Sequence, residues 1–310
     1  MREQGYRWFR RWYSCLLLAL TLGWSFMLAA MPQAQLETVK LSDGRFYVLY
    51  VPSSLPSSAA APLVLMFHGG GGHAEQAAQA YGWQATADKY GFVLVFPNGS
   101  SRLPRARLAT WNAGNCCGYA RDEHIDDVAF VRQVIADVQR RVAVDPQRIF
   151  ATGMSNGAML SQRLACEMSD TFRAIAAVAG TDNTRQCPLQ QPLSVLLIHA
   201  KDDTHVLYQG GAGKDAFRDD SKVTDFTSVP ATLQRWRQRL QLSDVSAQTS
   251  TQPGAAFERY KSQDGRIELQ LISTDTGGHS WPGSKPVRGK TPSTAIAANE
   301  QIWQFFARQR

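Results

Sequence analysis

Short runs of apolar and β-branched residues alternate with helix-like patterns along most of this chain, and this alternation constrains the fold more than any other feature. The runs are Phe46–Val51, Leu63–Phe67, Phe92–Phe96, Ile149–Thr152, Ala174–Val178, Val195–Ile198 and Ile267–Ile272. Several are hydrophobic at nearly every position, which is typical of strands buried on both faces. The sequence therefore predicts an α/β fold with a mostly parallel central sheet and helices on both faces.

Three segments have helical patterns. Apolar residues recur at spacings of three and four between Val128 and Val142, which predicts a helix with one buried stripe. A second helix is expected from Gly157 to about Met168, and a last one over Ala295–Arg308. The long segments Asn98–His124 and His205–Pro230 carry neither pattern, and we expect them to form a lid or a pocket wall.

The first 34 residues have the layout of a secretory signal. Four arginines precede Cys15–Ala30, an uncharged stretch of 16 residues, and small residues follow it. This stretch is shorter than the roughly 20 residues that cross a bilayer. We interpret residues 1–34 as a signal peptide, with an uncleaved anchor as the alternative, and residues 35–310 as one domain of a secreted or periplasmic protein without stable membrane contact after cleavage.

The positive charge of the chain does not indicate a nucleic-acid partner. The formal net charge of +7 falls to +4 when the four arginines and Glu3 of the first 34 residues are left out. The remaining charge is scattered, and the group formed by Arg102, Arg105 and Arg107 is interpreted as a solvated loop.

Four cysteines follow the N-terminal segment, namely Cys116, Cys117, Cys166 and Cys187. An even number in an exported protein favours disulfides. Because vicinal cysteines rarely pair with each other, we expect Cys116 and Cys117 to bond to Cys166 and Cys187 in one of two pairings. A metal site is the weaker interpretation, since the spacing is not that of zinc ligands.

Ser155 lies in Gly153-Met154-Ser155-Asn156-Gly157, directly after an apolar run. A strand that turns sharply into a helix strains its turn residue, and glycines two positions away on each side remove side chains that would collide. The pentamer predicts a nucleophile elbow that exposes the hydroxyl of Ser155, although an ordinary Gly/Ser turn has the same composition.

A serine nucleophile needs a histidine base, and three histidines follow Ser155. His199 lies within an apolar run, which favours a structural position at a strand end, and His205 precedes the region where the acid should come first. His279 lies in a loop rich in glycine between the last strand and the last helix. We predict that His279 is the base and that Trp281, two residues later, lines the pocket or packs the loop.

The acid that orients the base is expected just after the strand Val195–Ile198, where ligand sites of such sheets gather. Asp202 and Asp203 both stand there. We predict Asp203, with Asp202 as a solvated neighbour and Asp182 as a lesser alternative.

The run His68-Gly69-Gly70-Gly71-Gly72 follows the strand Leu63–Phe67 and can supply backbone N–H donors to an oxyanion. We predict Gly70 and Gly71 as donors, the N–H of Asn156 as the second contribution, and His68 as a brace of the loop. A phosphate-binding loop is the competing interpretation, but the lysine and Ser/Thr of that motif are missing.

These residues resemble the esterase family that includes poly(3-hydroxybutyrate) depolymerases and feruloyl or acetylxylan esterases. The resemblance spans His68–Gly72, Phe96-Pro97-Asn98-Gly99, Trp111-Asn112 with Cys116-Cys117-Gly118, Asp126-Asp127-Val128 with Phe130, Val144-Asp145-Pro146, Gly153–Gly157, Ile198-His199 with Asp203, and Gly277-Gly278-His279 with Trp281-Pro282-Gly283. It implies an α/β-hydrolase fold, a Ser155/Asp203/His279 triad, and no metal or organic cofactor.

The chain departs from the family pattern at the acid, where Ala200, Lys201 and Thr204 stand in place of the flanking glycine and proline that are common in the family. No separate polymer-binding domain is visible in this sequence, which favours small or polysaccharide-linked esters over polymer granules. We expect a secreted serine carboxylesterase that acts on feruloyl, other hydroxycinnamoyl or acetyl esters. The alternatives are a poly(3-hydroxybutyrate) or oligomer depolymerase and a non-catalytic binding protein with the same fold.

Overall fold

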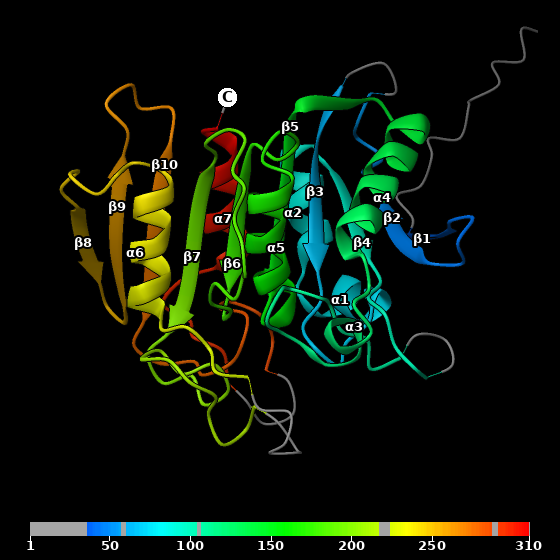
Figure 1. Ribbon diagram of the computed structural model, residues 1–310. Helices are drawn as coiled ribbons and strands as arrows, with labels where there is room; N and C mark the ends of the chain where they lie inside the picture. Colours follow the sequence, from blue (N-terminus) through cyan, green and yellow to red (C-terminus); the bar gives the residue numbers. More distant parts are fainter. Residues whose placement is uncertain (1–35, 57–59, 104–106, 217–223, 287–290, 310) are drawn as a thin grey trace, which may run out of the picture. The chain divides into compact units, whose positions relative to one another are not determined.

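A ten-stranded sheet in the order β1-β2-β4-β3-β5-β6-β7-β10-β9-β8 organises the computed structural model (Figure 1). The structure describes residues 36–56, 60–103, 107–216, 224–286 and 291–309. The strands are β1 Leu36–Lys40, β2 Phe46–Tyr50, β3 Ala61–Phe67, β4 Val93–Pro97, β5 Val144–Met154, β6 Ala174–Val178, β7 Ser194–Ala200, β8 Gln248–Gln252, β9 Ala255–Lys261 and β10 Glu268–Thr274. The helices are α1 Ala74–Ala80, α2 Trp83–Tyr90, α3 Gly118–Asp122, α4 Asp127–Arg141, α5 Asn156–Glu167, α6 Val229–Arg239 and α7 Ala298–Ala307.

The centre of the sheet is parallel and its edges are antiparallel. Strands β4, β3, β5, β6, β7 and β10 form the parallel part, and β1–β2 and β9–β8 extend it on opposite sides. The predicted α/β class with a mostly parallel sheet is confirmed. All seven predicted strands are present. Strands β1, β8 and β9 were not predicted. Strand β8 is exposed along its whole length and β1 at four of its five positions, while β9 is mostly half-buried, so none of the three carries a continuous hydrophobic run.

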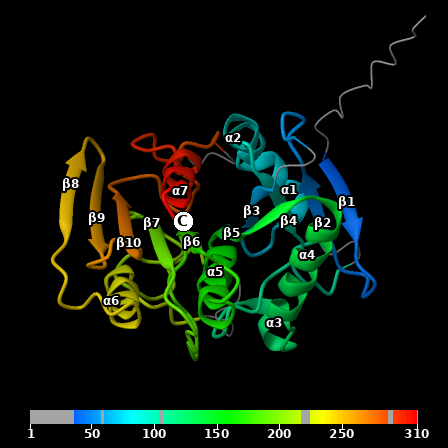
Figure 2. The same ribbon diagram turned by 90° about the horizontal axis from the view of Figure 1, so that it is seen from above.

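Two hydrophobic layers cover the two faces of the sheet. Residues of α1, α2 and α7 pack on one face, and residues of α4, α5 and α6 pack on the other (Figure 2). Within β3 the side chains alternate between the layers, since Leu63 and Leu65 belong to one and Val64 and Met66 to the other. Burial on both faces explains why the central strands are hydrophobic at nearly every position.

The three predicted helices are confirmed as α4, α5 and α7, each within a few residues of its expected ends. The structure also contains α1, α2, α3 and α6, which were not predicted. Helix α3 lies within the segment Asn98–His124 and α6 begins at the end of His205–Pro230, so neither segment is wholly irregular. Helices of seven and five residues such as α1 and α3 are too short to show a clear period.

The sheet brings four chain segments to one edge. Strand β3 lies between β4 and β5, so the chain adds β4 on one side of β3 and β5 on the other. The carboxyl ends of β3 and β5 are therefore neighbours, with Phe67 opposite Gly153. Strands β7 and β10 are also parallel neighbours, with Ala200 opposite Thr274. Ligand sites of open parallel sheets lie at such carboxyl ends, beside the place where the strand order reverses, which is called the switch point.

The chain divides into the units Met1–Pro32 and Gln33–Arg310, and the sheet and its helices belong to the second. Residues 1–34, predicted to be a signal peptide or alternatively an uncleaved anchor, lie outside the described residues. Within the ranges that are described, no helix is both long enough and apolar enough to cross a membrane.

Replacement of Phe150 tests the layer that α7 forms on the sheet. The ring of Phe150 is fully buried and stacks on Phe306 with 4.6 Å between ring centroids. Phe150→Ala should lower the free energy of unfolding by about 3–5 kcal/mol, because it leaves a cavity under α7. Urea unfolding measures this loss, and Leu103→Ala, at a side chain that is 47% exposed, is the control. Equal, small losses in both variants would contradict this packing.

Candidate active site

Ser155 occupies a strained turn between β5 and α5. Its backbone has φ 54° and ψ −120°, and its N–H donates to the carbonyl oxygen of Val178, 2.8 Å away. A Cβ on Gly153 would overlap the backbone of Gly157, and a Cβ on Gly157 would overlap the carbonyl oxygen of Phe67 on β3. The two glycines therefore let α5 start directly against β3, and the elbow geometry that the pentamer predicts is present.

The hydroxyl of Ser155 lies at one end of a chain of hydrogen bonds. Its Oγ is 2.8 Å from Nε2 of His279, and Nδ1 of His279 is 2.8 Å from Oδ2 of Asp203. An ionised carboxylate only accepts, so Nδ1 of His279 carries the proton and Nε2 is left to accept from the hydroxyl. The structure thus brings together the three residues that were predicted from separate parts of the chain. This order of contacts activates a serine by general-base catalysis.

Asp203 is buried and surrounded by donors. Its Oδ1 accepts from the backbone N–H groups of His205 and Val206, at 2.8 and 3.1 Å. Its Oδ2 faces His279 and also Nε2 of His199, 3.3 Å away. Burial alone would raise the pKa of Asp203, but the hydrogen bonds from His199 and His279 outweigh it and hold the pKa well below its usual value. Asp203 is therefore ionised beside the imidazole at neutral pH.

The other two candidate acids lie elsewhere. Asp182 is fully buried and faces arginines of α6, with Nη1 of Arg239 at 2.8 Å and Nη1 of Arg235 at 3.6 Å. Asp202 is exposed, as expected of a solvated neighbour, but its carboxylate also accepts from the N–H groups of Gly277 and Gly278, at 3.2 and 2.8 Å. These two hydrogen bonds, which connect the segment after β7 to the loop that carries His279, were not predicted.

The loop before His279 depends on its two glycines. Gly277 has φ 124° and Gly278 has φ 56°, both in the region that disfavours side chains. A Cβ on Gly277 would also come within 2.6 Å of the backbone nitrogen of Ser293. The carboxylate of Asp202 accepts hydrogen bonds from the two glycine N–H groups and so holds the loop in place. The position of the His279 imidazole therefore depends on Asp202.

Two further histidines surround the proposed base and acid. His199 lies at the end of β7, as predicted, and its Nε2 is 2.8 Å from the carbonyl oxygen of Val206. The ring of His205 is parallel to that of His279, with 4.5 Å between centroids and 8° between planes. Only the tertiary structure shows this stacking.

In the part of the chain that is described, Asp203, His205 and His279 also form the group of ligand atoms within 4.8 Å of one another that could hold a metal ion.

The predicted oxyanion donors differ in position. Asn156 is the first residue of α5, where backbone N–H groups have no partner within the helix. Gly70 and Asn156 both line a cavity that opens at Ser155, and a Cβ on Gly70 would lie 3.5 Å from Cβ of Asn156. Gly71 is not placed as predicted, because its N–H donates to the carbonyl oxygen of Ala109, 2.8 Å away, and Gly69 lines the cavity in its stead. Donation by Asn156 and Gly70 stays a prediction.

The side chain of Asn156 ties the elbow to the segment that follows β4. Its Oδ1 accepts from the N–H of Trp111 at 2.7 Å, and its Nδ2 donates to the carbonyl oxygen of Trp111 at 3.0 Å. The next residue, Asn112, donates its N–H to the buried carboxylate of Asp127, which also contacts Arg45 at 2.7 Å. This network connects the start of α5 to the start of α4.

His68 braces the glycine run, as predicted. Its Nδ1 is 2.8 Å from the carbonyl oxygen of Gly69, and its Nε2 accepts from the N–H of Gly99 at 3.0 Å. The ring is buried and lies over Trp111, with 4.9 Å between centroids. Burial lowers the pKa of His68 to about 4, so it is neutral near pH 7 and acts as a structural link between β3 and β4.

A cavity of about 570 Å³ opens at Ser155, and we call it the acyl cavity. Met154, Met159 and Val206 contribute apolar side chains to it. Trp281 lines it too, but is only 3% exposed, donates from Nε1 to Asn299 and contacts the ring of Tyr81 with 4.9 Å between centroids. Both predicted roles of Trp281, packing of the loop and contact with the pocket, are therefore compatible with its position.

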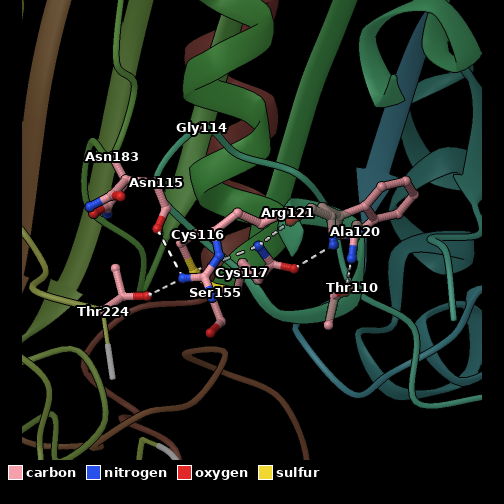
Figure 3. The surroundings of a disulfide bond; sticks show 12 residues. Thr110, Gly114, Asn115, Cys116, Cys117, Ala120, Arg121, Ser155, Asn183 and Thr224 are labelled. Atoms are coloured by element: carbon pink, nitrogen blue, oxygen red, sulfur yellow. Dashed lines mark hydrogen bonds between the residues drawn. A yellow bond between two sulfur atoms is a disulfide. The ribbon is translucent and has the colours of Figure 1, made fainter. Parts of the chain in front are cut away.

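The predicted disulfide pairing is wrong. Cys116 and Cys117 are bonded to each other (Figure 3). Cys166 on α5 is bonded to Cys187, with 4.6 Å between their Cα atoms. The hydrogen bonds of Trp111 with Asn156 hold the Cys116 segment at the active-site edge. Cys166 lies ten residues, or about 15 Å, further along α5 than Asn156, which is too far for a bond to Cys116 or Cys117.

This chain is similar to known esterases. Residues 45–188 match the family model described as esterase PHB depolymerase. Feruloyl esterase B of Piromyces equi is 27% identical over 242 residues, which are 76% of this chain and 42% of that protein. Putative esterase NocK of Nocardia uniformis subsp. tsuyamanensis is 27% identical over 283 residues, 86% of this chain and 78% of the relative. This chain thus spans less than half the length of the Piromyces protein.

Among solved structures, the acetyl xylan esterase from Aspergillus awamori superimposes with a TM-score of 0.63 at 14% identity. The superposition covers 88% of this chain and 99% of that protein. At this identity the likeness concerns the fold alone, and it agrees with an α/β-hydrolase arrangement.

The neutral state of His68 makes stability depend on pH. In the unfolded chain a histidine binds a proton near pH 6.5, whereas folded His68 does so only near pH 4. Between these pH values the unfolded chain binds one proton more than the folded protein. The contribution of His68 to stability is therefore complete above pH 6.5 and is lost as the pH falls towards 4. The contribution of His68 should be about 3 kcal/mol between pH 7 and pH 4.

Urea unfolding at both pH values measures this contribution. When the pH is lowered from 7 to 4, the free energy of unfolding of His68→Gln should fall by about 3 kcal/mol less than that of the parent protein, although the variant is less stable at pH 7. His124→Gln, at an exposed histidine, is the control and should follow the parent. If all three proteins lost the same free energy, His68 would not be the buried neutral group described here.

Asp202 is expected to position the base without touching the substrate. Asp202→Ala should lower kcat/KM for an ester about 10-fold, because the loop of Gly277 and Gly278 loses both acceptors and the imidazole shifts. Asp202→Asn keeps an acceptor oxygen and should recover part of the activity. Asp275→Ala removes another exposed carboxylate of this loop, which pairs with Lys201, and serves as the control.

Proposed function

Because this chain belongs to the esterase family that includes feruloyl esterases and poly(3-hydroxybutyrate) depolymerases, we propose that it is a serine carboxylesterase with Ser155 as nucleophile. The observation that carries the proposal is the hydrogen-bonded chain from Ser155 through His279 to Asp203, with 2.8 Å at each step. This is the geometry that a hydroxyl needs to become a nucleophile at neutral pH.

In the proposed reaction, Oγ of Ser155 attacks the ester carbonyl carbon while Nε2 of His279 takes the hydroxyl proton. Asp203 keeps the imidazole in the correct tautomer and stabilises the imidazolium that forms. The negative charge that develops on the carbonyl oxygen is stabilised by the N–H groups of Asn156 and Gly70. His279 then protonates the departing alcohol, and a water molecule, activated by the same imidazole, releases the acid from Ser155.

The acyl group is proposed to be a hydroxycinnamoyl group such as feruloyl, with acetyl as a smaller substrate. The supporting observation is the lining of the acyl cavity, which combines the aromatic rings of Tyr81 and Trp281 with the side chains of Met154 and Met159. A planar aromatic acid can contact rings and thioethers over a large area. The relative from Piromyces equi is named a feruloyl esterase, which agrees with this choice.

The matched family model favours a second substrate class, oligomers of hydroxyalkanoic acids, because its description names a PHB depolymerase. The same three residues would hydrolyse such an ester. Product analysis with hydroxybutyrate oligomers separates the two classes, and release of no monomer or dimer would eliminate the second.

The proposal includes export. The arginines and the uncharged stretch of residues 1–34 support a secreted or periplasmic enzyme that meets small or polysaccharide-linked esters rather than nucleic acids. Fractionation of cells that express the full chain, followed by N-terminal sequencing of the exported protein, tests this part separately.

Ser155→Ala tests the mechanism. It should lower hydrolysis of methyl ferulate and of a short acetyl ester by at least about 10⁴-fold, because the nucleophile is absent while the cavity stays intact. Ser243→Ala, at an exposed serine, is the matched control and should retain the parent activity. Equal rates in the parent and in Ser155→Ala would rule out this nucleophile.

A fluorophosphonate decides between this enzyme and the alternative of a non-catalytic binding protein. Mass spectrometry should find the phosphonyl group on Ser155 of the parent and of Ser243→Ala. No labelling of the parent, together with no turnover of any ester, would favour binding without catalysis.

A further inference from the structure

The ring of His205 covers one face of the imidazole of His279, and the triad chemistry does not use this contact. The two rings are stacked, with 4.5 Å between centroids and 8° between planes. Both side chains line the acyl cavity, and that of His279 is only 11% exposed. The two hydrogen bonds of the triad join the edge of this imidazole, at Nδ1 and Nε2, whereas His205 contacts its face.

The backbone of His205 is fixed by bonds that do not involve its ring. Its N–H donates to Oδ1 of Asp203 at 2.8 Å, and its carbonyl oxygen accepts from the N–H of Gly213 at 2.8 Å. A Cβ on Gly213 would overlap the carbonyl oxygen of Thr204, so only glycine permits this close return of the chain. The ring of His205 is therefore carried by a backbone that is bonded to the acid of the triad.

A ring on the face of His279 restricts a motion that the triad leaves free. An imidazole held only at Nδ1 and Nε2 can still rotate about the line that joins these two atoms. A flat ring stacked on its face opposes this rotation, and stacked aromatic pairs shift an equilibrium by up to about 10-fold. The two residues before His279, Gly277 and Gly278, have no side chain that could serve the same purpose.

A metal site is the competing interpretation of this contact, because Asp203, His205 and His279 bring ligand atoms within 4.8 Å of one another. The angle between the rings argues against a shared ion. A metal ion lies close to the plane of each imidazole that binds it, since the lone pair of the nitrogen points along that plane. Two stacked, nearly parallel rings direct their lone pairs into separate planes. The geometry favours contact between the rings themselves.

We propose that His205 is a positioning residue that keeps the imidazole of His279 aligned in the acyl-enzyme. This inference rests on the proposed serine esterase function. In the free enzyme the hydroxyl of Ser155 donates to Nε2, so both edge bonds of the ring are present. In the acyl-enzyme, Oγ of Ser155 is bonded to the acyl carbon and has no proton to donate. The ring is then held by Asp203 at Nδ1 and by His205 on its face.

This alignment matters for the second half of the reaction. A water molecule attacks the acyl carbon while Nε2 of His279 takes its proton. The proton then passes to Oγ of Ser155 as the bond between Oγ and the acyl carbon breaks. A ring that has rotated away cannot accept the proton of the water, and a displacement of about 1 Å can cost about 100-fold in rate. Loss of the stack should therefore slow deacylation more than acylation.

His205→Ala tests this expectation in the hydrolysis of p-nitrophenyl acetate. The variant should lower the rate of deacylation, measured in the steady phase after the burst of nitrophenol, by about 10-fold. Because kcat/KM reports the steps up to acylation, kcat and KM should fall together and kcat/KM should change by less than about threefold. If His205 instead acted by binding the acyl group, KM would rise in the variant, and that result would overturn the inference.

His205→Phe separates the stack from the chemistry of an imidazole, because it keeps a flat ring and removes both nitrogens. It should restore most of the rate of deacylation, and a rate as low as that of His205→Ala would reject the stack as the cause. Thr204→Ala is the matched control in the same turn. Its hydroxyl donates to Asp215 at 2.7 Å, and its side chain lies outside the lining of the acyl cavity. Thr204→Ala should match the parent.

Crystal structures separate this inference from the proposed function, since they need no turnover. Ser155→Ala removes the bond to Nε2 and so reproduces the contacts that His279 has in the acyl-enzyme. Its imidazole should stay against Asp203, whereas in the double variant Ser155→Ala/His205→Ala the ring should leave this position or occupy two. An unmoved ring in the double variant overturns the inference while the esterase function stands. A displaced ring in a protein that hydrolyses no ester removes the esterase function and supports the positioning contact.

Discussion

The close approach of α5 to β3 is the constraint on which the rest of this structure depends. Strands β3 and β5 are parallel neighbours with Phe67 opposite Gly153, and α5 starts so near to them that a Cβ on Gly157 would overlap the carbonyl oxygens of Phe67 and His68. Only glycine permits this contact, and it places the glycine run after β3 beside the first N–H groups of α5. Ser155, the candidate oxyanion donors and the switch point of the sheet consequently lie together.

Asp203 is the second centre of organisation. It is buried at the end of β7, yet it accepts from two backbone N–H groups and faces two imidazoles. Because each of these donors favours the ionised carboxylate, a charge is retained inside the protein at the point where the imidazolium of His279 would form. Asp202, one residue earlier, accepts from the N–H groups of Gly277 and Gly278. Two consecutive carboxylates therefore contact the imidazole of His279 and the backbone just before it.

The residues at the site were predictable where chemistry and chain order restrict the choice. Ser155 was identified by its glycines, His279 by its loop, and Asp203 by its place after a strand, and the structure brings the three within hydrogen-bond distance. The parallel strands were visible because burial on both faces makes them continuously hydrophobic. Strand β8 and helix α3 were not, because one is entirely exposed and the other is a single turn with no readable period.

The sequence by itself determined the class of fold, the elbow at Ser155 and the types of residue that could form a triad, since these depend on hydrophobic periodicity and local backbone sterics. Only the tertiary structure decided the pairing of Cys116 with Cys117, the hydrogen bond of Gly71 to Ala109 and the stacking of His205 on His279. Each of these is set by the arrangement of loops at the carboxyl edge of the sheet. That arrangement arises from hydrogen bonds between segments far apart in the chain, which no local pattern of residues encodes.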